Sequence, residues 1–189
     1  MDRLPHTNSS TEALPSADRA DDGPSSRGED RAAPVIDAEV LGSSLAASVI
    51  ARSSGFSAAA DSLARALDLD PRRVQGELAY VSIFTVHFCV HAVFDDALAA
   101  RVVHTMYEAL WAAPETWSTT REGASERARD YADALAHPHA EYGRAYTVGR
   151  VFARWCGASH DVVVVECGAR AYMTQLAPLV AFLRQCPVG

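Results

Sequence analysis

The stretch from Leu78 to Phe94 is apolar around almost its whole circumference when it is wound as a helix. Valine, isoleucine and phenylalanine fill most of its positions, and His87 and His91 are the main interruptions. A helix without a polar face must be surrounded, either by other helices or by lipid. The stretch is only marginally long enough for a bilayer. We therefore expect it to be the central helix of a helical bundle.

The flanking sequence supplies helices that can surround this central one. The spacing of apolar residues predicts amphipathic helices over about 37–52, 57–68, 97–111 and 118–136. The pair Asp70-Pro71 is typical of a helix N-terminus, because aspartate caps the first turn and proline lacks only an N–H that would be unpaired there. We expect the central helix to begin at this pair.

The last third of the sequence predicts a further pair of helices. We expect one from about Thr147 to Glu166, a break near Gly168, and another to about Arg184 that Pro178 should kink. The run 162–165 consists of four valines and has strong strand propensity. A lone strand would leave its backbone groups unpaired, and no second strand candidate is present, so we expect this run to be helical.

The first 34 residues differ in composition from the rest of the chain. They mix prolines, serines, glycines and scattered charges, and their apolar residues are too few to offset the entropy of ordering. The whole chain has 189 residues, of which 49% are hydrophobic. We therefore predict a disordered tail over 1–34 and one all-α domain over 35–189, a globular bundle of about six or seven helices.

The charged residues and cysteines exclude several classes of function. The net charge is -7 and all 17 basic residues are arginine, so the chain offers no catalytic lysine, and nucleic acid is an unfavourable partner. Four cysteines without a C-x-x-C pair indicate a reducing compartment rather than a disulfide scaffold. The sequence has neither a G-x-S-x-G elbow nor a glycine-rich phosphate loop. We expect a protein that is not an enzyme and holds no cofactor.

The segment Thr147–Trp155 carries the most specific motif. It reads Thr-Val-Gly-Arg-Val-Phe-Ala-Arg-Trp, and it resembles the BH1 motif of the Bcl-2 family, which is Asn-Trp-Gly-Arg followed by valine or isoleucine, a gap, alanine and aromatic residues. The residues that match this order are Gly149, Arg150, Val151, Ala153 and Trp155. Those that depart from it are Thr147, Val148 and Arg154, and the family's later Gly-Gly-Trp region is missing.

The resemblance implies a Bcl-2-like bundle that inhibits apoptosis by holding the BH3 helices of pro-apoptotic proteins in a hydrophobic groove between helices. It implies that Gly149 lets the ligand approach closely, that Arg150 pairs with a ligand aspartate, and that Phe152 and Ala153 help to floor the groove. The resemblance does not identify the specific BH3 partners or the oligomeric state. It also does not decide whether the protein inhibits or promotes cell death.

The degree of divergence resembles that of viral members of the family. Such a protein would act in the host-cell cytoplasm or at the mitochondrial outer membrane. The family's hydrophobic C-terminal anchor is missing from the sequence, so we expect membrane association only if an anchor has been removed.

A second interpretation rests on the central helix. His87, His91 and Asp95 follow one another at spacings of four residues and therefore share a face, which is a spacing that can hold zinc or iron. His104 and Glu108 would be the further ligands. This alternative predicts a metal-binding helical enzyme or sensor, although H-E-x-x-H is absent.

Overall fold

The computed structural model describes residues 35–113 and 121–188. The tail predicted over 1–34 and the first residues of the helix predicted over 118–136 lie outside this part of the chain. The described residues form seven helices and no strand, so the predicted all-α bundle is confirmed. The helices are α1 (Ala38–Ser54), α2 (Ser57–Leu67), α3 (Pro71–Val93), α4 (Asp96–Ala112), α5 (Arg121–Ala136), α6 (Gly143–Trp155) and α7 (Val162–Gln185).

Helix α3 is the centre of the bundle, as its sequence predicts. Its N-cap is Asp70, whose carboxylate accepts a hydrogen bond from the Arg72 N–H at 3.0 Å. Fourteen of its residues are buried. Within the described residues it is the one helix long and apolar enough to cross a membrane, yet 72% of its apolar window is buried inside the bundle.

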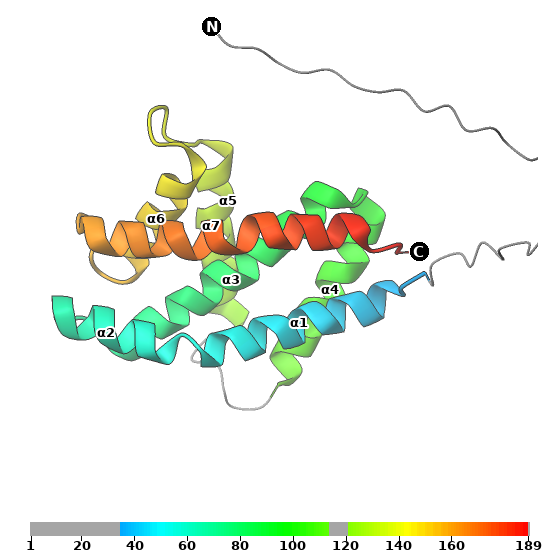
Figure 1. Cartoon of the computed structure of the whole chain (residues 1–189), viewed down its shortest axis with the longest axis horizontal. Coiled ribbons are helices and arrows are strands. Elements are labelled where there is room, and N and C mark those ends of the chain that lie inside the picture. The colour runs from blue at the N-terminus through cyan, green and yellow to red at the C-terminus, as the bar shows by residue number, and fades with distance from the viewer. Residues whose placement is uncertain (1–34, 114–120, 189) are drawn as a thin grey trace, which may run out of the picture. The chain divides into compact units, whose positions relative to one another are not determined.

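Two closely packed helix pairs flank α3. Helix α1 packs along α4 and α6 packs along α7, while α1, α2 and α7 each contact α3 directly. Figure 1 shows α1 and α7 running along neighbouring sides of the bundle with α3 between and behind them. The start of α1 is joined to the end of α7, because the Ile36 N–H donates to the Pro187 carbonyl at 2.6 Å.

The predicted boundary between the last two helices is wrong. Helix α6 ends at Trp155, and Gly157 adopts a positive φ of 83° in the turn that follows. Asp161 then caps α7, because its carboxylate accepts hydrogen bonds from the N–H groups of Val163 and Val164. The four valines are helical, as predicted.

Helix α7 continues through Gly168, where the sequence predicts a break. Gly168 is buried against α6, and a Cβ atom at this position would lie 2.5 Å from the Cβ of Phe152. The glycine therefore permits close packing of two helices instead of ending one. Pro178 also lies inside α7.

Candidate functional site

Three of the four residues predicted to bind a partner are part of the core. A Cβ atom on Gly149 would collide with the carbonyl oxygen of Val165, so the backbone that closely approaches Gly149 is that of α7. Phe152 and Ala153 are both 0% exposed. Phe152 lies against Gly168 of α7, and both side chains are closed to solvent, so neither floors an open groove in this structure.

The fourth predicted residue, Arg150, is exposed on α6. It lines a hollow of about 240 Å³ together with mainly polar and charged side chains of α5 and α6, among them Asp130, Asp133 and Arg154. Arg154 forms an ion pair with Asp130. On its other side Arg150 lines a second hollow of about 280 Å³, which Tyr146, Val162 and Val165 help to form. The surroundings of Arg150 are thus polar on the side of α5 and mixed on the side of α7.

The three residues of the alternative metal site do not converge on one point. The rings of His87 and His91 stack with centroids 4.8 Å apart, and Nδ1 of His87 lies 3.2 Å from the Tyr107 hydroxyl oxygen. The Asp95 carboxylate instead caps α4, where it accepts a hydrogen bond from the Leu98 N–H at 3.0 Å. Within the described part of the chain, no group of three or more histidine, cysteine or acidic residues is arranged to hold a metal ion.

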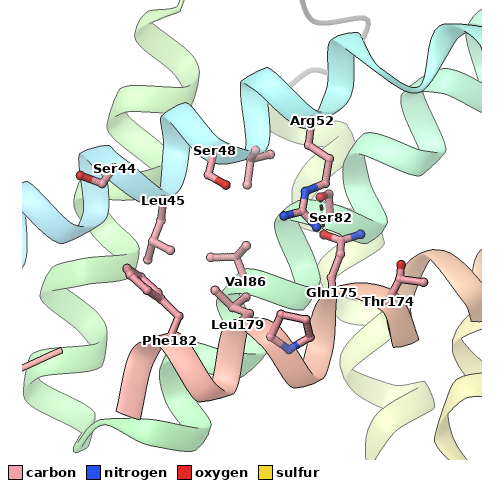
Figure 2. A pocket seen from close by; sticks show the side chains of 12 residues that line it. Ser44, Leu45, Ser48, Arg52, Ser82, Val86, Thr174, Gln175, Leu179 and Phe182 are labelled. Carbon is pink, nitrogen blue, oxygen red and sulfur yellow. Dashed lines mark hydrogen bonds between the residues drawn. The ribbon is translucent and has the colours of Figure 1, made fainter. Parts of the chain in front are cut away.

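An open apolar groove lies elsewhere, between α1 and α7, with α3 as its floor. We call it the α1–α7 groove, and its volume is about 360 Å³. Figure 2 shows the apolar Leu45, Val86, Leu179 and Phe182 directed from three helices into the space between them. Its residues are Ser44, Leu45, Ser48, Val49, Arg52, Ser82, Val86, Thr174, Gln175, Pro178, Leu179 and Phe182.

The walls of the groove differ in character. On α1 the buried Leu45 and Val49 alternate with the exposed, small Ser44 and Ser48. The Ser44 hydroxyl donates to its own helix, at the Val40 carbonyl, so it does not demand a hydrogen bond from a ligand. This wall is therefore apolar at its base and permits close approach at its rim.

The α7 wall carries the more exposed apolar surface. Phe182 is 49% exposed, and it lies with Leu45 and Leu179 at the end of the groove away from Arg52 (Figure 2). Pro178 has no N–H, so the Thr174 carbonyl has no donor at its usual helical position. The α7 wall thus offers the groove exposed apolar area.

Two buried polar side chains form the floor near the other end. The Ser82 hydroxyl donates to Oε1 of Gln175 at 2.6 Å, and Nε2 of Gln175 donates to the Ala171 carbonyl at 2.7 Å. Ser82 is 1% exposed and Gln175 is 5% exposed. Because these groups satisfy one another, burying this floor under a ligand would not leave them unpaired.

The α1–α7 groove was missed by the sequence analysis, although a pattern points to it. Residues 175, 178, 179 and 182 share one face of α7 at spacings of three and four. From the sequence alone, this segment is predicted only as a helix that Pro178 should kink. Neither a family model, nor a curated protein, nor a solved structure matches this chain.

Proposed function

We propose that this protein is a binding module that holds an amphipathic helix of a partner protein in the α1–α7 groove. The observation that carries the proposal is the groove itself, whose two flanking helices leave an apolar channel open to solvent. An amphipathic helix places its apolar face in such a channel through residues at spacings of three, four and seven. The volume of about 360 Å³ is within the range of ordinary ligand sites.

The BH1-like motif makes BH3 helices of pro-apoptotic proteins the first partners to test, and inhibition of apoptosis the corresponding activity. On this proposal the ligand contacts Leu45, Leu179 and Phe182. The motif itself supports the α6–α7 packing through Gly149, and Arg150 lies outside the groove.

A panel of BH3 peptides tests the proposal by fluorescence polarisation. At least one peptide should bind with micromolar affinity or better, which corresponds to about 8 kcal/mol. Phe182→Asp should weaken that binding at least tenfold, because it places a carboxylate where an apolar side chain of the ligand packs.

Met173→Asp is the matched control. Met173 lies on the same helix and is 52% exposed, close to the 49% of Phe182, but it does not line the groove. It should leave peptide affinity unchanged. If no peptide binds a folded sample, or if both substitutions weaken binding equally, the groove is not the site.

Arg150→Ala separates the proposed α1–α7 site from the site on α6 that the BH1-like motif implies. Binding in the α1–α7 groove should be insensitive to this substitution. A loss on Arg150→Ala together with tolerance of Phe182→Asp would return the site to α6, as the sequence motif implies.

A further inference from the structure

We infer that the partner helix carries an acidic side chain that pairs with Arg52. This inference rests on the proposed function and adds to it a chemical requirement on the partner. Arg52 is in the last turn of α1 and is exposed. Among the twelve described residues that line the groove, it is the one with a formal charge.

The orientation of Arg52 is the first support. Figure 2 shows its guanidinium directed into the groove, toward the pair formed by Ser82 and Gln175. An arginine with no role in the groove would be expected to extend into water, where its charge is best hydrated. Its direction places five N–H donors over the polar end of the channel.

The missing counter-charge is the second support. Within residues 35–113 and 121–188, Arg52 takes part in no ion pair. In the same part of the chain no hydrogen bond joins Arg52 to Gln175, whose Oε1 accepts from Ser82 and whose Nε2 donates to the Ala171 carbonyl. When a helix covers the groove and removes water, the guanidinium requires an acceptor from the ligand, and a carboxylate offers a bidentate one.

The distance between the apolar end and the charged end of the groove predicts where the acidic side chain of the ligand should lie. Leu45 marks the apolar end and Arg52 the charged end, seven residues further along α1. At about 1.5 Å per residue this is about 10 Å, or two helical turns. A helix lying along the groove should therefore carry its acidic side chain about two turns from the apolar residue that packs beside Phe182.

Two synthetic amphipathic helices test the requirement. Both have leucine at spacings of three and four, and one has glutamate seven residues from a central leucine where the other has glutamine. The glutamate peptide should bind the full chain at least tenfold more tightly than the glutamine peptide. The difference should shrink as sodium chloride is raised, because salt screens the attraction that brings the two charges together.

Substitution of the arginine completes the test. Arg52→Gln should abolish the difference between the peptides without changing the affinity of the glutamine peptide. Arg65→Gln, which removes a cation in the last turn of α2, should keep the difference.

The outcomes separate the inference from the proposed function. If both peptides bind equally and Phe182→Asp weakens both, the groove stands and the role of Arg52 is overturned. If neither peptide binds, the proposed function fails with the inference. Sodium dodecanoate is the third probe: Arg52-dependent binding of dodecanoate without peptide binding would identify a lipid site and overturn both.

Discussion

The carboxylate of Glu77 on α3 is held by the guanidinium of Arg127 on α5. Nε of Arg127 donates to both carboxylate oxygens, at 2.7 and 3.0 Å, and a second nitrogen also donates to the carboxylate. Glu77 is 2% exposed, and Arg127 lies over the rings of Tyr80 and Trp155. The pair therefore fastens α5 to the central helix in a site nearly closed to water.

Glu77→Gln and Arg127→Met should each destabilise the bundle strongly. Each leaves one buried charge without its partner, which costs about 3–5 kcal/mol. The double variant should lose less free energy of unfolding than the two single variants lose in sum, because no unpaired charge is left in it. Urea denaturation followed by circular dichroism measures the free energy of unfolding in all three.

An exposed ion pair provides the control. Arg101 and Glu39 pair at 3.2 Å, but their side chains are 52% and 56% exposed. Glu39→Gln should change the free energy of unfolding by about 1 kcal/mol or less. A similar small loss for Glu77→Gln would mean that the Arg127 site is hydrated.

The fold of the described residues could be predicted from the sequence wherever a single local pattern decides the structure. The Leu78–Phe94 run predicts a buried helix because no polar face exists to be left in water, and Asp70 marks its start because the cap is a local interaction. The four valines after Asp161 are helical despite their strand propensity, and no strand that could pair with them lies within residues 35–113 and 121–188.

The errors arise where a residue acts through a distant partner. Gly168 was interpreted as a break, but it faces Phe152 of another helix, and nothing near it in sequence shows this. Gly149 was assigned to a ligand although α7 fills its space. The groove depends on the place where α1 and α7 separate, and the spacing of apolar residues in the sequence does not reveal that place.

Stability should fall as pH is lowered through the range in which His87 titrates. Burial, with a smaller effect of the neighbouring His91, lowers the pKa of His87 from 6.5 to about 4. Between these values the unfolded chain binds a proton at His87 that the folded chain does not. The free energy of unfolding therefore decreases as pH falls from 6.5 toward 4.

His87→Phe isolates this contribution in urea denaturation at a series of pH values. The decrease between pH 6.5 and 4 should be smaller in this variant than in the unsubstituted chain. Tyr107→Phe is the control, because it removes the hydroxyl beside His87 but leaves the imidazole in the bundle, so the pH dependence should persist. Identical curves for His87→Phe and the unsubstituted chain would show that the imidazole is hydrated when folded.

The buried hydrogen bond beneath the groove gives a test of its floor. Gln175→Leu leaves the Ser82 hydroxyl buried without its acceptor, which should lower the free energy of unfolding by about 1–3 kcal/mol. Adding Ser82→Ala should recover part of this loss, since the unpaired group is then removed. Thermal and urea unfolding measure both. A double variant less stable than Gln175→Leu would mean that water already satisfies the serine.

Gly149→Ala tests whether the most specific sequence motif serves packing. The added Cβ meets the carbonyl oxygen of Val165, which belongs to the backbone of α7 and cannot turn away as a side chain can. Helices α6 and α7 must separate, and overpacking of this kind costs about 1–3 kcal/mol in the free energy of unfolding. Gly55→Ala is the matched control, because Gly55 has an ordinary negative φ of -76° and its nearest atom to an added Cβ is 3.2 Å away. Urea denaturation should show a loss for Gly149→Ala several times that for Gly55→Ala. Equal stability of the two variants would mean that α6 and α7 are not in close contact at Gly149, and the motif would again be available to a ligand.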